Sequence, residues 1–113
     1  MKTKILIMLT IMITLFSANI FAKDVITKTS FKVNGNCDMC KSRIEKATKT
    51  KGVKSANWNE QTHILTIVYV PAKISADQIK QNIANAGYDT DKFKSTAEDY
   101  NKLPQCCQYE RVN

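Results

Sequence analysis

Short runs of apolar residues alternate with polar breaks along most of the chain, and the spacing of the apolar positions changes from segment to segment. Residues 25–33 (VITKTSFKV) alternate loosely between apolar and polar side chains, which is typical of a half-buried strand. Residues 53–59 (VKSANWN) and 64–70 (ILTIVYV) have the same character, and a short polar turn separates them. The pattern predicts three strands, and the last two form an antiparallel hairpin.

Two other segments have helical spacing. Cys40, Ile44 and Ala47 share one face of the first segment, which ends at Gly52. The second segment begins at a capping box in which Ser75 is followed three positions later by Gln78. Its apolar stripe and the glycine that ends it are Ile79, Ile83, Ala86 and Gly87. We therefore predict one helix on each side of the hairpin.

Residues 88–93 (YDTDKF) supply a fourth, short strand in this scheme. The order of elements is then β-α-β-β-α-β, which is the order of a ferredoxin-like sandwich. We predict an α+β fold with two helices on a four-stranded antiparallel sheet over residues 23–93. Residues 94–113 form a short C-terminal extension that ends in QCCQYERVN and contains a Cys-Cys pair.

The first 22 residues have a different composition from the rest of the chain. Lys2 and Lys4 precede an apolar run over residues 5–16, and the small residue Ala22 follows. The charged start and the small residue at the end predict a secretory signal peptide over residues 1–22 with cleavage after Ala22. The alternative is a transmembrane anchor, but about a dozen apolar residues fall short of the roughly 20 that span a bilayer. We expect a periplasmic protein that is not inserted in the membrane after cleavage.

Length and charge limit the range of functions. Removal of 22 residues from a chain of 113 leaves 91, enough for one small domain. The net charge of +7 would fall to +5 with the loss of Lys2 and Lys4. The remaining lysines are spread along the chain, which favours a solvated basic surface over a nucleic-acid site. Because no set of nucleophile, base and acid is evident, we expect a binding protein rather than an enzyme.

A C-x-x-C motif, Cys37 and Cys40, joins the first strand to the first helix. The spacing places Cys37 in a loop and Cys40 in the first helical turn, so that both sulfurs can converge on one point. A helix N-terminus favours negative charge and lowers the pKa of a nearby thiol. Two thiolates suit two-coordinate Cu(I) better than four-coordinate Zn(II), and Hg(II) satisfies the same geometry.

The residues around this motif resemble the heavy-metal-associated domain family. The resemblance covers about residues 26–93 and rests on VNGNCDMCKSRIEKA, the GV at 52 and 53, ILTIVYV, and IANAGYD at 83–89. It implies that Cys37 and Cys40 are the metal ligands and that Tyr88 lies in the loop that shields the site. The family usually has a methionine ahead of the first cysteine, whereas here the methionine, Met39, lies between the two cysteines.

The family includes copper chaperones, metal-binding modules of metal-pumping ATPases and periplasmic mercuric-ion-binding proteins. The resemblance therefore implies an exported protein that binds and transfers Cu(I) or Hg(II) for metal trafficking or detoxification. The implied partner is a metal donor or acceptor, such as a metal transporter or an efflux component. A metal-bridged dimer is an alternative to a monomer.

Cys106 and Cys107 allow three interpretations from sequence alone. They can fold back and add a third or fourth thiolate, which would admit Zn(II) or a larger soft ion. They can form a vicinal disulfide or act as a resolving pair for the first site. They can also lie in an exposed tail without a role.

Two other functions are compatible with the C-x-x-C motif. The same spacing at a helix start occurs in thioredoxin-like oxidoreductases, although no tryptophan precedes Cys37 and the chain is short for that fold. A structural disulfide between Cys37 and Cys40 would add little stability, because it closes a very short loop. His63 is expected to be a surface residue rather than a ligand.

Overall fold

The computed structural model describes residues 24–111, and the signal peptide expected over residues 1–22 lies outside this range. The elements in chain order are β1 (Thr27–Lys32), α2 (Asp38–Thr48), β2 (Val53–Trp58), β3 (Ile64–Tyr69), α3 (Ala76–Asn85), α4 (Ala97–Asn101) and the 3-10 turn η2 (Gln105–Cys107). This order confirms the predicted α+β, ferredoxin-like fold. Within the part of the chain that the structure describes, no helix is long and apolar enough to cross a membrane.

The sheet has three strands in the order β1-β3-β2, and both pairings are antiparallel. Leu65 in the central strand lies opposite Phe31 of β1 and Trp58 of β2. This register places three large side chains on one face of the sheet, which is the face that the helices cover. The alternation seen in the sequence of β3 is the cause, since every second side chain of a strand points to the same face.

The expected fourth strand over residues 88–93 is reduced to one isolated antiparallel bridge between Val33 and Thr90. Beyond that bridge the segment curls back on itself. The backbone N–H of Thr90 donates to the carbonyl of Phe93 at 2.8 Å, and the hydroxyl of Thr90 accepts from the N–H of Phe93 at 2.9 Å. These local bonds occupy backbone groups that a fourth strand would need for pairing with β1. The predicted four-stranded sheet is therefore corrected to three strands and an isolated bridge.

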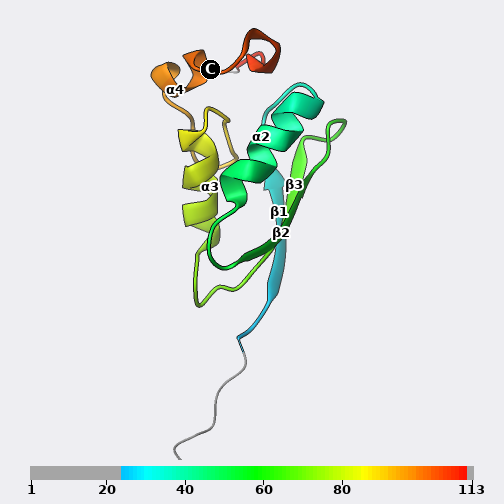
Figure 1. The fold of residues 1–113 in the computed structure, drawn as a ribbon, viewed down its shortest axis with the longest axis vertical. Helices are drawn as coiled ribbons and strands as arrows, with labels where there is room; N and C mark the ends of the chain where they lie inside the picture. Colours follow the sequence, from blue (N-terminus) through cyan, green and yellow to red (C-terminus); the bar gives the residue numbers. More distant parts are fainter. Residues whose placement is uncertain (1–23, 112–113) are drawn as a thin grey trace, which may run out of the picture.

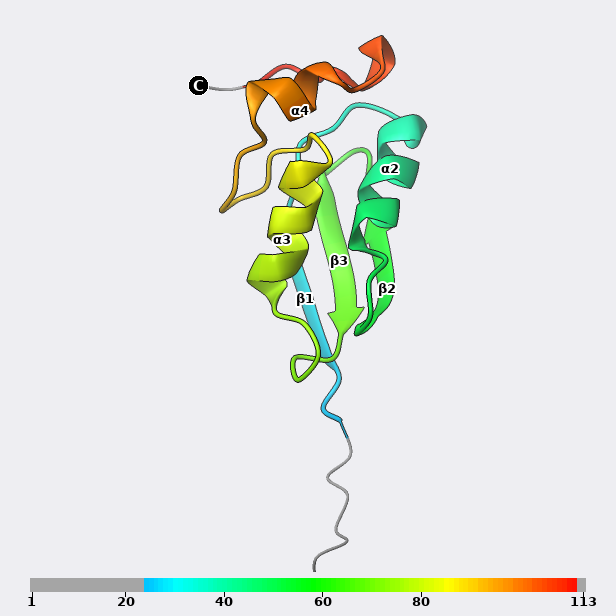
Figure 2. The same cartoon turned by 60° about the vertical axis from the view of Figure 1, so that its left-hand side comes forward.

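Helices α2 and α3 lie side by side on one face of the sheet, and the other face is open (Figures 1 and 2). The capping box of α3 forms as predicted: the side chain of Ser75 accepts from the N–H of Gln78, and Gln78 binds back to Ser75. The core between helices and sheet contains large apolar side chains, chiefly Phe31, Ile44, Trp58, Leu65, Ile67, Ile79 and Ile83. Their burial is the main force that holds the two layers together.

The C-terminal extension crosses the end of the sandwich at which α2 begins (Figure 2). Leu103 and Tyr109 in this extension are buried and belong to the core. Leu103 packs directly on the end of α3, where Gly87 has a φ of 106° and a Cβ would come within 2.9 Å of the Leu103 Cγ. The extension is therefore packed into the domain, and the interpretation of an exposed tail is wrong.

Candidate metal centre

The loop before α2 positions the C-x-x-C motif. Cys37 is the N-cap residue of α2, with extended backbone and no capping hydrogen bond from its side chain. Cys40 lies in the first turn and is completely buried. Gly35 lets this loop lie flat on the core, since a Cβ there would come within 3.0 Å of the Trp58 ring and 3.2 Å of Ile44. The Cys37 thiol makes no capping bond to α2 and instead contacts the carbonyl of Cys106 at 3.8 Å.

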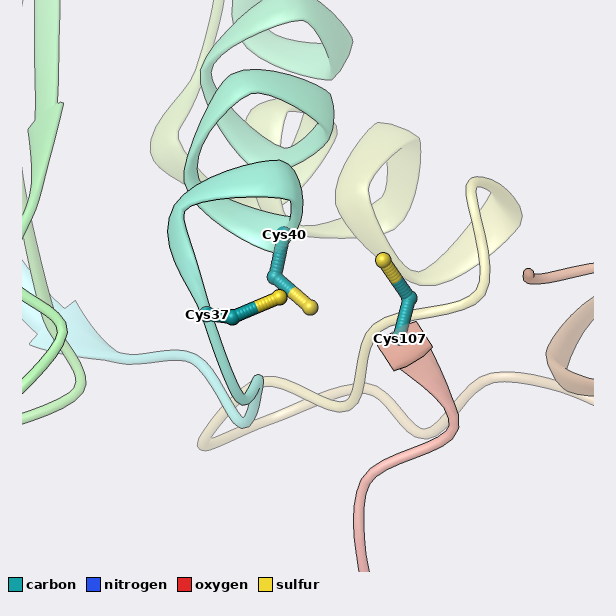
Figure 3. A group of neighbouring side chains, drawn as sticks. All are labelled: Cys37, Cys40 and Cys107. Atoms are coloured by element: carbon teal, nitrogen blue, oxygen red, sulfur yellow. The ribbon is translucent and has the colours of Figure 1, made fainter. Parts of the chain in front are cut away.

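The structure brings a third cysteine to this motif. The sulfurs of Cys37, Cys40 and Cys107 all lie within 4.8 Å of one another, and we call these three residues the inner cluster (Figure 3). Cys107 comes from η2 and is completely buried. Three sulfurs bound to one ion at about 2.3 Å, the Zn–S bond length, would lie about 4.0 Å apart in a plane. The inner cluster needs a contraction of less than an ångström to hold a single ion.

The two adjacent cysteines have different surroundings. The Cys106 side chain is exposed, and its sulfur lies 3.4 Å from the Met39 sulfur and 3.9 Å from the Cys107 sulfur. Cys107 alone of the pair points into the inner cluster. All four cysteines are free thiols, so no vicinal disulfide links the pair in this state.

The residues after η2 anchor the extension to the domain. The hydroxyl of Tyr109 donates to the carbonyl of Gly87 at 2.8 Å and accepts from the N–H of Asp89 at 2.9 Å. Arg111 donates to both carboxylate oxygens of Asp89, at 3.0 and 2.8 Å, and the carboxylate side chain of Asp89 is 5% exposed. On the other side, the amide of Asn36 donates to the carbonyl of Cys106 at 3.3 Å. Bonds on both sides of Cys107 thus fix its place beside the C-x-x-C motif.

The inner cluster contains one thiol whose pKa is lowered and one whose pKa is raised. Burial opposes ionisation of Cys40, but hydrogen bonds from the backbone at Asn36 and Cys37 outweigh it and lower the pKa of Cys40. Burial raises the pKa of Cys107 to about 12, and its contact with Cys40 acts in the same direction. A metal ion bound by Cys107 must therefore displace a proton from it, which couples binding to proton release.

Backbone groups, and not the neighbouring Lys41, stabilise the thiolate form of Cys40. The ammonium of Lys41 donates to the carboxylate of Glu45 and to the carbonyl of Trp58, each at 2.9 Å. These partners lie on the β2 side of the helix, away from the extension. The N-terminus of α2, which favours negative charge, lies at the thiols instead.

Tyr88 lies beside the inner cluster, in the position that the resemblance implied. Its side chain is completely buried, and its hydroxyl has no hydrogen-bond partner among the described residues within ordinary bonding distance. Burial raises the pKa of Tyr88 well above its usual value, and the neighbouring thiols Cys107 and Cys40 raise it further. The hydroxyl therefore stays protonated and is available to donate to a thiolate sulfur.

The remaining candidates lie outside the inner cluster. His63 stacks on the Trp58 ring at a centroid distance of 5.4 Å, in a turn where its φ is 60°. It contributes to packing at the end of the hairpin and not to the metal centre.

Tyr109 and Arg111 were not singled out from the sequence. The signal that marks them is the presence of an aromatic and a basic residue directly after the cysteine pair.

Comparisons with known proteins identify the family of the sandwich that carries these thiols. The family model of the heavy-metal-associated domain matches residues 30–89. The copper-exporting P-type ATPase of Staphylococcus epidermidis is 30% identical over 88 residues, which are 76% of this chain and 11% of the ATPase. That of Staphylococcus saprophyticus is 40% identical over 63 residues, 55% of this chain and 8% of the ATPase. The chain thus spans about a tenth of the length of these relatives.

Solved structures are similar over most of the sandwich. The CopZ metallochaperone has a TM-score of 0.55 and 32% identity, and the match covers 57% of this chain and 98% of CopZ. Oxidized MerP from Ralstonia metallidurans CH34 has a TM-score of 0.56 and 25% identity, with 58% of this chain and 94% of MerP covered. The two small proteins are covered almost completely, whereas about two fifths of this chain has no counterpart in them.

Proposed function

Because this chain belongs to the heavy-metal-associated domain family, we propose that it binds and transfers a soft metal ion, Cu(I) or Hg(II), through Cys37 and Cys40. Cys107 supplies a third sulfur from the extension. The observation that carries the proposal is the convergence of three thiols within 4.8 Å at a helix N-terminus. The ion is cargo in this proposal, and the protein carries out no chemistry on it beyond ligand exchange.

The donor set favours a soft ion. Thiolates select soft ions such as Cu(I) and Hg(II), and all three ligand atoms of the inner cluster are sulfur. Zn(II) in a closed protein site takes four ligands in a tetrahedron, and the inner cluster offers three. Between the two soft ions, the similarity to copper-exporting ATPases supports Cu(I), and a set of thiolates suits Hg(II) as well.

The partner we propose is a metal transporter or efflux component that offers its own cysteine pair. Transfer would proceed by exchange of one sulfur at a time, so that the ion is never free. The sequence similarity to the copper-exporting ATPases supports a partner of this class. The signal-like residues 1–22 support export to the periplasm, where the partner site would face the same compartment.

We expect the metal-loaded protein to be a monomer rather than a metal-bridged dimer. A site with only two sulfurs can recruit a third from a second molecule, but here Cys107 of the same chain already fills that position. Sedimentation of the protein with one equivalent of Cu(I) measures this directly.

The alternative function is that of a thiol-disulfide oxidoreductase, and the third thiol near the C-x-x-C motif is the observation in its favour. The burial of Cys40 and Cys107 argues against it, since a catalytic thiol must meet the disulfide of a protein substrate. Insulin reduction in the presence of dithiothreitol separates the two functions: catalysis above the uncatalysed rate would favour the oxidoreductase.

The test of the main proposal is an anaerobic Cu(I) titration of the reduced protein against a competing chelator. The double variant Cys37→Ser, Cys40→Ser should lose the first equivalent of Cu(I). Cys106→Ser is the matched control, because it removes a cysteine that lies outside the inner cluster and should keep the first equivalent. A double variant that binds the first equivalent as tightly as the unmodified protein would refute the proposal.

A further inference from the structure

Met39 has an unusual position for a long apolar side chain. It is 47% exposed at the start of α2, and few other large apolar side chains among residues 24–111 are this exposed. Packing in the core therefore does not explain its place. Its sulfur instead lies 3.4 Å from the Cys106 sulfur, although the two residues are 67 positions apart in the sequence.

The fold holds these two sulfurs together. The amide of Asn36 and the thiol of Cys37 both donate to the carbonyl of Cys106, at 3.3 and 3.8 Å. These contacts tie the backbone of Cys106 to the loop that carries the C-x-x-C motif, two positions before Met39. The Cys106 side chain remains exposed beyond this anchor.

We propose that Met39 and Cys106 form an outer binding site for Cu(I), through which the ion enters and leaves the inner cluster. The outer site deepens the proposed function and rests on it. Thioether and thiolate sulfurs are soft donors, so the pair selects Cu(I) against Mg(II) and Ca(II), and its two donors do not supply the four ligands that Zn(II) takes. Two sulfurs that share an ion at about 2.3 Å each can be up to about 4.6 Å apart. The observed 3.4 Å falls within this limit.

An exposed site beside the inner cluster would aid loading, because two of the three inner sulfurs are buried. Cys40 and Cys107 are completely buried, and only Cys37 is partly accessible. A donor protein or a small thiol complex of Cu(I) cannot reach the buried sulfurs directly. The outer site offers two exposed sulfurs next to them, one of which is covalently adjacent to the inner ligand Cys107.

The distances define a path between the two sites. The Cys106 sulfur lies 3.9 Å from the Cys107 sulfur, which itself lies within 4.8 Å of the other two inner sulfurs. The ion binds Met39 and Cys106, and the Cys106 thiol releases its proton to solvent. A bond to the Cys107 sulfur then forms as its thiol proton passes to solvent, and the bond to Met39 breaks. Bonds to the sulfurs of Cys37 and Cys40 form next, with any thiol proton still on them passing to solvent, and the bond to Cys106 breaks. The Cys106 thiolate regains a proton when the ion has moved inward, and copper stays Cu(I) throughout.

Methionine methyl resonances report on the outer site directly. The reduced full chain is labelled with ¹³C at the methionine methyl groups, and the Met39 signal is assigned by its loss in Met39→Leu. The first equivalent of Cu(I) should leave this signal in place, and the second should shift it. In Cys106→Ser the second shift should disappear. An unshifted signal at two equivalents, or an unchanged shift in Cys106→Ser, would overturn the proposal.

The rate of loading tests the entry path. Stopped-flow transfer of one equivalent from a Cu(I)–bathocuproine complex should be slower in Met39→Leu and Cys106→Ser, while the final occupancy stays the same. Ile26→Leu is the matched control, since Ile26 is 60% exposed and lies at the opposite end of β1 from the motif. Equal rates in all four proteins would refute the path.

The double variant Cys37→Ser, Cys40→Ser separates the two proposals. If both are correct, it loses the first equivalent but still shows the Met39 shift when Cu(I) is added. If it binds both equivalents as the unmodified protein does, the proposed function fails while the outer site stands. If it binds Cu(I) without any Met39 shift, the outer site is refuted.

Discussion

Arg111 binds the buried carboxylate of Asp89 with two of its nitrogens, at 3.0 and 2.8 Å. Asp89 directly follows Tyr88, which lies beside the inner cluster, and Arg111 lies four positions after Cys107. This ion pair therefore connects the last residues of the extension to the loop that shields the metal centre. The pair holds the backbone that follows Cys107 and lies outside the inner cluster.

Arg111→Ala should both destabilise the protein and loosen Cys107. Loss of a charge-assisted pair at a buried carboxylate costs about 2 kcal/mol, measured as the free energy of unfolding in urea. The number of sulfurs bound to Cu(I), read by X-ray absorption, should fall from three toward two. Lys102→Ala is the control: its side chain is 69% exposed and its ammonium lies near Glu98, so its loss should cost less than about 0.5 kcal/mol and leave the coordination intact.

Cys107→Ser should remove one sulfur from the bound ion without unfolding the domain. At one equivalent of Cu(I), X-ray absorption should show three sulfurs in the unmodified protein and two in the variant. The affinity should fall by at least about tenfold, because even the loss of a partner outside the ligand shell has that effect. Cys106→Ser at one equivalent should keep three sulfurs. Two sulfurs in the unmodified protein would show that Cys107 is not a ligand.

Tyr88→Phe should separate metal affinity from stability. The Tyr88 hydroxyl is buried without a partner among the described residues, so its removal should leave the free energy of unfolding of the metal-free protein within about 1 kcal/mol or raise it. A hydrogen bond from this hydroxyl to a metal-bound thiolate would be lost, and Cu(I) affinity should fall about 10- to 100-fold. Tyr69→Phe, at the far end of β3, should leave the affinity unchanged.

Gly87→Ala should strain the turn on which the extension packs. The φ of 106° and the approach of a Cβ to within 2.9 Å of Leu103 predict a loss of about 1–3 kcal/mol in the free energy of unfolding. Displacement of the extension should also remove the Cys107 sulfur from the bound ion. Gly52→Ala is a matched control, because Gly52 has a φ of 101° and a close contact with Lys73, remote from the extension. It should destabilise the protein and keep three sulfurs.

The strands, the helices and the C-x-x-C motif could be predicted because their signals are local. Alternation in ILTIVYV, the capping box at Ser75 and the glycines after the helices lie within a few residues of the structure they determine. The prediction of a fourth strand over residues 88–93 was wrong for a local reason that the alternation of apolar and polar residues does not reveal. The Thr90 side chain and backbone bind Phe93 and turn the segment back.

The sequence by itself determined the sandwich and the pair Cys37 and Cys40, since a strand end and a helix start bring those two thiols together whatever the rest of the chain does. Only the tertiary structure decided which cysteine of the second pair joins them. The packing of Leu103 and Tyr109 on the domain sets the orientation of η2, and that orientation turns Cys107 inward and Cys106 toward Met39. These contacts join residues far apart in the sequence, so no local pattern of spacing carries them.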